Sequence, residues 1–248
     1  NTVESIATMP NGDIVIGGRF SGGIARWNGT TWQQLGTGMD GLVYALFVMP
    51  NGDLLAGGGF QTAGGASANS IARWNGSSWS ALGVGVPNGV VHRIALMQNG
   101  DLAVGGLFTS AGGVGANYIA RWNGSNWTTF GTGLAPTPLS TSVVTAITIL
   151  PSGEMIVGGG FPGAGGVPAA SVARWNGTSW SGLAPGINER VLTIQLLPDE
   201  GLVVGGNFTA IGSIGANRIA TWNGITWLPL GSGMDGRVYS MARMTNGD

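Results

Sequence analysis

The sequence contains no cysteine and no lysine, and it has a single histidine. The missing cysteines exclude disulfides, cysteine metal sites and thiol nucleophiles. Charged residues make up only 8% of the chain and the net charge is -1. No basic surface is therefore expected to attract nucleic acid or an anionic membrane. No apolar run reaches the roughly 18 residues of a membrane helix, so no membrane insertion is predicted.

The sequence also has no signal peptide and begins with Asn1 rather than Met, which we interpret as a processed form or a fragment of a longer array. Glycine and proline together account for 59 of 248 residues, close to the composition of disordered chains. The glycines nevertheless recur at fixed places between short apolar runs. This regularity favours a folded repeat protein over disorder.

A nine-residue pattern, I-A-R-W-N-G-x-x-W, occurs five times, with valine for isoleucine in the fourth copy and threonine for arginine in the fifth. Its first tryptophans are separated by 47, 48, 53 and 47 residues and are Trp27, Trp74, Trp122, Trp175 and Trp222. Periods of about 40 to 50 residues are typical of propeller blades and of helical solenoids. The glycine density and the strand-length apolar runs exclude helices.

One complete unit, residues 41–82, predicts four short antiparallel strands. Asn51-Gly52 and Asn75-Gly76 are expected to form tight hairpin turns, and 61–69 is expected to be a loop. Four such strands make a propeller blade. The sequence thus predicts an all-β fold, a β-propeller of about five four-stranded antiparallel blades with a redundant terminal strand.

These repeats predict a single domain over 1–248. The expected blades span 1–40, 41–87, 88–140, 141–188 and 189–235, and 236–248 is expected to be the spare first strand of a further repeat. Residues 3–13 and 238–248 repeat the same element, so one copy is redundant. A free strand edge invites pairing, so self-association through this spare strand is one possible interaction.

Large aromatic residues recur once or twice in each unit. Strand alternation places the two tryptophans of a unit on one sheet face, where they are expected to pack between blades beside a small alanine. The predicted structural core contains Trp27, Trp32, Trp74, Trp79, Trp122, Trp127, Trp175, Trp180, Trp222, Trp227, Phe20, Phe60, Phe108, Phe161 and Phe208.

The unit resembles the Kelch type of blade, which has a double glycine after its second strand, as at Gly17-Gly18 and Gly57-Gly58. It is more similar to the bacterial delta-sixty-type propeller repeat, on the V-V-G-G-N-F-T run of 203–209 followed by Arg218-Ile219-Ala220. The G-M-D-G-x-V-Y run also resembles repeats of fungal cortical cell-polarity markers. These resemblances imply an extracellular or cell-surface scaffold.

Chain direction places the loops between strands two and three, and those between blades, on one face of the fold. Binding residues usually lie on loops of a rigid scaffold. The candidate ligand-binding residues on this face are Asn69, Asn117, Asn217, Asp40 and Asp235. Neutral variation of these loops is the alternative interpretation.

Charged residues of the repeat are expected to have structural roles. Asp13, Asp53, Asp101 and Glu154 follow turn glycines, and solvation of the turns explains them better than a Ca²⁺ site, because no calcium-loop motif is present. The arginine before each first tryptophan is expected to lie across the next strand and to bond hydroxyl groups and carbonyls. We predict no metal and no cofactor.

Enzyme chemistry finds little support in the sequence. His92 has no evident triad partners and is expected to line a central channel. A pair of glycosidase carboxylates is possible among eleven acidic residues, but no acid interrupts an apolar strand. The sequence therefore predicts a non-catalytic surface scaffold or protein-interaction module. The alternative is a lectin with one carbohydrate site per blade, so the expected partner is a protein or a glycan.

Overall fold

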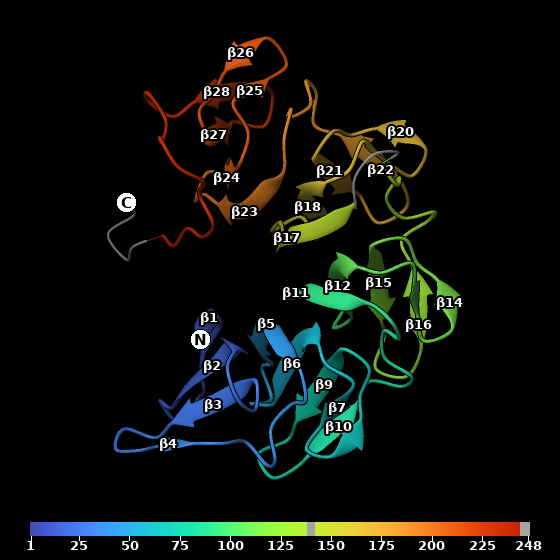
Figure 1. Ribbon diagram of the computed structural model, residues 1–248. Coiled ribbons are helices and arrows are strands. Elements are labelled where there is room, and N and C mark those ends of the chain that lie inside the picture. Colours follow the sequence, from blue (N-terminus) through green and yellow to red (C-terminus); the bar gives the residue numbers. More distant parts are fainter. Residues whose placement is uncertain (138–141, 244–248) are drawn as a thin grey trace. The chain divides into compact units, whose positions relative to one another are not determined.

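The computed structural model describes residues 1–137 and 142–243. They form two compact units, Asn1–Thr129 and Phe130–Asp248, which are considered separately. The described residues contain no helix long and apolar enough to cross a membrane. Each repeat builds one four-stranded antiparallel sheet in which consecutive strands of the repeat are neighbours (Figure 1).

The first unit holds three of these sheets. Their strands are β1 (Thr2–Thr8), β2 (Ile14–Arg19), β3 (Ile24–Trp27) and β4 (Trp32–Gln33); β5 (Leu42–Val48), β6 (Leu54–Gly59), β9 (Ile71–Trp74) and β10 (Trp79–Ala81); and β11 (Val90–Leu96), β12 (Leu102–Leu107), β15 (Ile119–Trp122) and β16 (Trp127–Thr129). The strand order confirms the predicted all-β repeat of four antiparallel strands.

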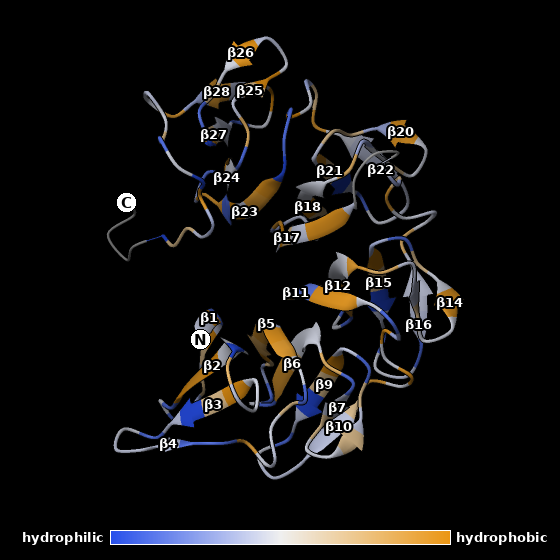
Figure 2. Ribbon diagram, viewed as in Figure 1, coloured by the Kyte–Doolittle hydropathy of each residue, from blue (hydrophilic) through white to orange (hydrophobic). Residues whose placement is uncertain are grey.

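The second unit holds the other two four-stranded sheets. Their strands are β17 (Val143–Ile149), β18 (Met155–Gly160), β21 (Val172–Trp175) and β22 (Trp180–Gly182); and β23 (Val191–Leu196), β24 (Leu202–Gly206), β27 (Ile219–Trp222) and β28 (Trp227–Pro229). The first strands of the second to fifth repeats are rich in apolar residues, and much of each is orange in Figure 2. Their composition fits strands that are covered on both sides.

The segment 61–69, predicted to be a loop, contains a small two-stranded ribbon. Gly64 and Gly65 form its turn at φ +60° and +83°, a region of backbone conformation that favours glycine. Equivalent ribbons occur in the next three repeats, and the first repeat is too short at this point to form one. The ribbon strands are β7 (Thr62–Ala63) and β8 (Ala66–Ser67), β13 (Ser110–Ala111) and β14 (Val114–Gly115), β19 (Gly163–Ala164) and β20 (Val167–Pro168), and β25 (Ala210–Ile211) and β26 (Ile214–Gly215).

Each four-stranded sheet has two different faces, and neighbouring repeats pack one against the other. The tryptophan face carries the two tryptophans of the repeat, and we call the other side the reverse face. In the first unit, Val15 and Ile24 on the reverse face of the first repeat share a core with Leu54, Trp74 and Trp79 of the second. The hydrophobic core of this chain therefore lies between repeats rather than inside any one of them.

The double glycine of the second strand is explained by close approaches on its two sides. A Cβ atom at Gly57 would lie 2.5 Å from Cγ1 of Val91 in the next repeat. A Cβ atom at Gly58 would lie 1.9 Å from the carbonyl oxygen of Leu42 in the neighbouring strand. Neither position has room for a side chain, so this motif reflects packing.

Ten of the fifteen residues of the predicted core are buried. Trp74, Trp79, Trp127, Trp175, Trp180, Trp227, Phe60, Phe108, Phe161 and Phe208 are buried, and Trp27, Trp122, Trp222 and Phe20 are partly exposed. Trp32 corrects the prediction, because it is 53% exposed. It lies on the tryptophan face of the first repeat, opposite Trp27 in the strand register.

The predicted spare strand is not formed among residues 236–243, and 244–248 lie outside the described residues. Val238 nonetheless packs over Gly205, as Val43 packs over Gly17, and its N–H donates to the carbonyl of Gly206 at 3.2 Å. The segment therefore begins with the packing of a first strand. The described residues thus offer no spare strand for self-association.

Candidate functional site

The four repeated acids pair with the four repeated arginines, which corrects both sequence predictions for these residues. Asp53 lies just before β6 and accepts a hydrogen bond of 2.6 Å from Nε of Arg73 on β9. The other pairs are Asp13–Arg26, Asp101–Arg121 and Glu154–Arg174. The aspartates are buried, so they do not serve to solvate turns. The arginines bond these carboxylates rather than hydroxyl groups of the next strand.

The fifth repeat lacks both members of this ion pair. Gly201 stands at the position of the acid, and Thr221 stands at the position of the arginine. Because β24 and β27 pair in the same register as β6 and β9, the two positions are neighbours in space. Their joint change was the signal in the sequence that could have revealed the pairs.

The predicted loop residues mainly hold the loops together. The Asp40 carboxylate accepts hydrogen bonds from N–H of Gln61 at 2.8 Å and Thr62 at 2.9 Å. Burial raises the pKa of Asp40, but the hydrogen bonds lower it by a larger amount in total. The pKa of Asp40 therefore lies below its usual range. Asn188, which sequence reasoning missed, has the same role in the fifth repeat and accepts from Thr209 and Ala210.

Two of the predicted asparagines hydrogen-bond to the loop that follows the fourth strand of their repeat. Nδ2 of Asn69 donates to the carbonyl of Val84 at 2.8 Å, and Nδ2 of Asn217 donates to that of Ser232 at 3.1 Å. Asn117 and Asp235 are exposed on equivalent loops. Asn217 and Asp235 line one hollow of the second unit, and Asp40, Asn69 and Asn117 lie on loops of the first unit.

His92 lies at a β-bulge that recurs in the first strand of every repeat. The extra residues at these bulges are Glu4, Tyr44, His92, Thr145 and Leu192. The rings of Tyr44 and His92 pack at a centroid distance of 4.8 Å. Burial lowers the pKa of the neighbouring Arg93, and the charge of Glu4 partly opposes this shift. A different residue type therefore stands at the bulge of each repeat, and the bulge changes the direction in which its side chain points.

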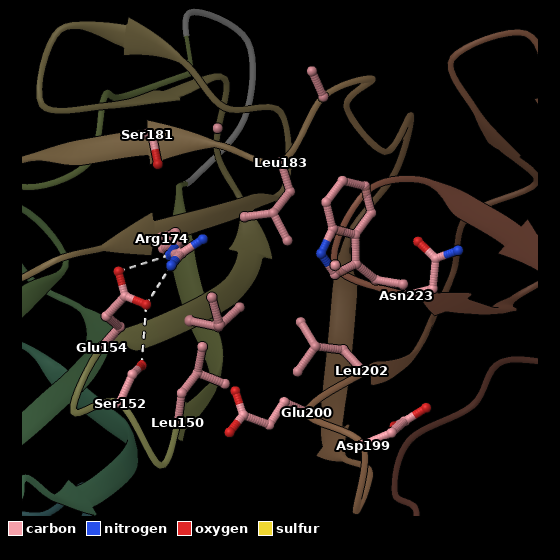
Figure 3. Close-up of a pocket in the computed structure, with 15 residues that line it drawn as sticks. Leu150, Ser152, Glu154, Arg174, Ser181, Leu183, Asp199, Glu200, Leu202 and Asn223 are labelled. Carbon is pink, nitrogen blue, oxygen red and sulfur yellow. Dashed lines mark hydrogen bonds and ion pairs between the residues drawn. The ribbon is translucent and has the colours of Figure 1, made fainter.

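The most distinctive cleft lies in the second unit, between the reverse face of the fourth repeat and the tryptophan face of the fifth. It has a volume of about 510 Å³ (Figure 3). Its walls are formed by Leu150, Ser152, Glu154, Ile156, Arg174, Ser181, Gly182, Leu183, Ala184, Asp199, Glu200, Leu202, Trp222, Asn223 and Gly224. We call it the fourth–fifth cleft.

One wall of the fourth–fifth cleft carries the Glu154–Arg174 ion pair. Nε of Arg174 donates to Oε1 of Glu154 at 2.9 Å, and Oγ of Ser152 donates to Oε2 at 3.0 Å. The hydrogen bond from Arg174 is the main reason that the pKa of Glu154 lies below its usual value, although burial opposes it. Glu154 is therefore held as a charged carboxylate at neutral pH.

The floor of the cleft is an acidic turn that breaks the repeat pattern. Where the first three repeats have Asn-Gly-Asp and the fourth has Ser-Gly-Glu, the fifth has Asp199, Glu200 and Gly201. The turn itself is kept, because Oδ1 of Asp199 accepts N–H of Gly201 at 3.1 Å. Glu200 has φ +64°, whereas the glycines at this position in the other repeats have φ of +86° to +88°. The carboxylate of Glu200 projects between the two walls (Figure 3).

The charges of the cleft do not balance. Glu154, Asp199 and Glu200 contribute three negative charges and Arg174 contributes one positive charge, so the lining has a net charge of -2. Trp222, which is only partly buried, adds an aromatic surface. An acidic cleft beside an indole suits a cationic or polar ligand. Among the described residues, no three histidine or acidic side chains could hold a metal ion.

No protein-family model and no curated protein matches the sequence. A GH74 enzyme of Niastella koreensis has a similar fold, with a TM-score of 0.61 and 20% identity over 91% of this chain and 36% of that one. A catalytically inactive virginiamycin B lyase of Staphylococcus aureus with quinupristin has a TM-score of 0.59 and 13% identity over 94% of this chain and 71% of that one. YCF48 bound to D1 peptide has a TM-score of 0.54 and 17% identity over 91% of this chain and 65% of that one. This chain thus spans 36 to 71% of the length of these proteins.

These similarities establish a β-propeller fold, as the repeats predicted. They also correct the prediction that the chain is not an enzyme, because a glycoside hydrolase and a lyase share this fold. The identities are low, so the likeness extends to the fold and not to a reaction. The propeller is a scaffold on which both binding and catalysis occur.

Proposed function

We propose that this propeller is an interaction module that binds an extended protein segment in the fourth–fifth cleft. The observation that carries the proposal is Glu200, an acidic residue held in a left-handed conformation on the floor of a cleft with net charge -2. Strained backbone conformations of this kind persist where the surrounding structure holds them, and they are enriched at functional sites. The other repeats avoid the strain by having glycine at this position.

The chemistry of the cleft favours a segment with a central arginine or lysine. The side chain's cation would meet the carboxylates of Asp199 and Glu200, and its aliphatic part would lie against Trp222. Ser152, Ser181 and Asn223 offer hydrogen bonds to a peptide backbone. Arg174 is engaged by Glu154, so it would not repel the incoming charge strongly.

The test uses short peptides centred on arginine or lysine, with glutamine-centred peptides of the same sequence as the control. Binding is followed through the indole N–H signals of tryptophan in nuclear magnetic resonance spectra. We expect the Trp222 signal to shift with the cationic peptides and not with the glutamine ones. No shift with either set would overturn the proposed ligand.

The matched variants are Glu200→Gly and Glu189→Gln, an exposed acid outside the cleft. Glu200→Gly should weaken peptide binding about tenfold, the usual size for one desolvated charge contact. The same change should stabilise the fold by up to about 1 kcal/mol, because glycine adopts positive φ without steric cost. Glu189→Gln should alter neither quantity. Weaker binding combined with higher stability would separate a binding role of Glu200 from a structural one.

A carbohydrate is the second candidate ligand, because the partly exposed indole of Trp222 and the adjacent Asn223 form a surface of the kind that stacks and hydrogen-bonds a sugar ring. A glycan array distinguishes the two candidates. Saturable glycan binding that is lost in Trp222→Ala, without any peptide binding, would replace the protein segment with a sugar.

We also propose that the repeats are of the Kelch-like or delta-sixty type and that they act as one domain over residues 1–248. An extracellular or cell-surface location completes this proposal. Its support is the double glycine near the end of each second strand and the V-V-G-G-N-F-T run of 203–209, whereas the W-N-G-x-x-W hairpin is more aromatic than the usual repeat of these families.

A further inference from the structure

Ten asparagines of this chain are followed directly by glycine, and nine of these Asn-Gly pairs lie in the described residues. The pair is chemically labile, because the backbone nitrogen of a glycine is unhindered and can attack the side-chain carbonyl carbon of the asparagine before it. The attack needs an asparagine side chain that is free to turn over the following peptide bond. The hydrogen bonds of each asparagine therefore decide how readily its pair reacts.

Eight of the nine described pairs hold the asparagine side chain with at least two hydrogen bonds. Oδ1 of Asn75 accepts N–H of Ser77 at 3.0 Å and N–H of Ser78 at 2.9 Å. Asn51 donates from Nδ2 to Oδ2 of Asp53 at 2.7 Å and accepts N–H of the same residue at 3.2 Å. The other pairs that are held in one of these two ways begin at Asn11, Asn28, Asn99, Asn123, Asn176 and Asn223.

Asn88 is the exception, and it lies with its neighbours in the first unit. Its side chain has no hydrogen bond within the part of the chain that the structure describes, and its backbone has φ +57°. N–H of Gly89 donates to the carbonyl of Val86 at 3.4 Å, whereas the equivalent bond of Gly52 is 2.9 Å. The asparagine side chain and the glycine nitrogen are therefore both held more weakly here than at the turn that contains Gly52.

Packing requires glycine at position 89. A Cβ atom there would lie 2.6 Å from Cβ of Phe108 and 2.8 Å from Cγ1 of Val86, so no side chain fits. The carbonyl of Gly89 accepts a hydrogen bond of 2.7 Å from Oγ of Ser70, a fully buried residue. The backbone at 89 is thus fixed by its surroundings, while the Asn88 side chain next to it is not.

We propose that the fold selects Asn88 as a site of spontaneous covalent modification, at which the chain deamidates. The backbone nitrogen of Gly89 bonds to Cγ of Asn88, and the bond between Cγ and Nδ2 breaks. Nδ2 leaves as ammonia and takes the proton of the backbone nitrogen, so the product is a cyclic imide. Water then opens the ring at either carbonyl and gives aspartate or isoaspartate.

The isoaspartate product alters the first unit, because its backbone is one methylene longer between positions 88 and 89. The longer link displaces the carbonyl of Gly89 from Oγ of Ser70, and a buried hydroxyl without its acceptor destabilises the fold. The modified protein should therefore unfold at a lower urea concentration than the unmodified protein.

The test incubates the purified, folded chain at mildly alkaline pH and follows each Asn-Gly pair by peptide mass spectrometry. Asn88 should convert at least about tenfold faster than Asn75 and Asn51, which is the rate equivalent of opening two hydrogen bonds. Asn75 and Asn51 are matched controls in the same molecule, since each is also followed by glycine. Isoaspartate in the peptide that contains position 88 identifies the cyclic imide as the intermediate.

The same incubation in urea shows whether the fold makes this selection. In the unfolded chain the three pairs should react at similar rates, because their hydrogen bonds are lost. Asn88→Gln should abolish the early conversion in the folded protein, since the longer side chain closes a larger ring slowly. Equal rates at Asn88 and Asn75 in the folded chain would overturn the proposal, and so would a preference for Asn88 that persists unchanged in urea.

Discussion

At the scale of single residues, the acid–arginine pairs show how a repeat maintains buried charge. The Asp53 side chain is 11% exposed and that of Arg73 is 50% exposed, so the arginine covers the acid while remaining hydrated. Asn51 adds a hydrogen bond of 2.7 Å to the same carboxylate. Burying a carboxylate with these partners reduces the stability of the fold little, whereas burying one without them reduces it strongly.

A double-mutant cycle on Asp53→Asn and Arg73→Thr measures this coupling. Arg73→Thr should destabilise the wild type more than it destabilises the Asp53→Asn variant, with a difference of about 0.5–1 kcal/mol, because the exposed guanidinium is screened by solvent. Urea unfolding gives each free energy. Additive effects would show that the two side chains do not depend on one another. The fifth repeat, with glycine and threonine at these positions, shows that the fold tolerates the loss of both.

The pH dependence of stability at Glu154 follows from the direction of its pKa shift. The hydrogen bond from Arg174 lowers the pKa of the folded state below its usual value. The resulting stabilisation is fully present above the unfolded-state pKa, about 4.3, and is lost as the pH falls through the lower folded-state pKa. The stability difference between the wild type and Glu154→Gln should therefore shrink as the solution is acidified through this range.

Arg174→Ala is the control for this titration. Without its main hydrogen-bond donor, the Glu154 carboxyl should contribute little pH dependence, so the effect of Glu154→Gln in this background should stay nearly constant. Urea unfolding at a series of pH values measures both backgrounds. A difference that grows on acidification in the wild-type background would contradict the assignment.

At the scale of elements, the strand that carries the second tryptophan owes its stability to the preceding repeat. Trp79 on β10 is buried and bonds the carbonyl of Leu35, whereas Trp32 on β4 is largely exposed. Trp79→Ala should therefore cost about 3–5 kcal/mol, and Trp32→Ala less than about 1 kcal/mol, although the two residues occupy the same repeat position.

This comparison is made by chemical denaturation. Equal losses for the two substitutions would mean that the tryptophan pair stabilises its own hairpin and not the contact with the neighbouring repeat. The test is sharp because the local sequence, W-N-G-x-x-W, is the same around both residues.

At the scale of the whole molecule, the core is divided among contacts between neighbouring repeats. Val15 and Ile24 of the first repeat belong to the cluster that contains Phe60, and a separate cluster in the second unit contains Phe208. In repeat architectures of this kind, stability is close to a sum of units and of their nearest-neighbour contacts.

Phe60→Ala tests whether stability is local. The lost side chain is 1% exposed, and its removal should cost about 3–5 kcal/mol in the first two repeats. Hydrogen exchange should then show weaker amide protection in β6 and β9, with protection in β24 and β27 unchanged. Uniform loss of protection along the chain would instead indicate one cooperative unit.

The sequence by itself determined the class of fold and the frame of the repeat. The period of 47 to 53 residues, the Asn-Gly turns and the alternating strands are local features, so they were readable without coordinates. The strand order within each repeat followed from the same local rules, because short turns leave consecutive strands no other partners. The ribbon at β7 and β8 escaped prediction because two-residue strands have too short a pattern to recognise.

Only the tertiary structure decided which residues act together. Asp53 and Arg73 are 20 positions apart, and their pairing depends on the register between β6 and β9. The burial of Trp79 depends on contacts with Val15 and Ile24 of the first repeat, which the sequence around Trp79 cannot report. The fourth–fifth cleft likewise arises from two repeats and from a turn whose strain is visible only in its φ angle. Contacts between repeats join distant parts of the chain, and local sequence patterns do not encode them.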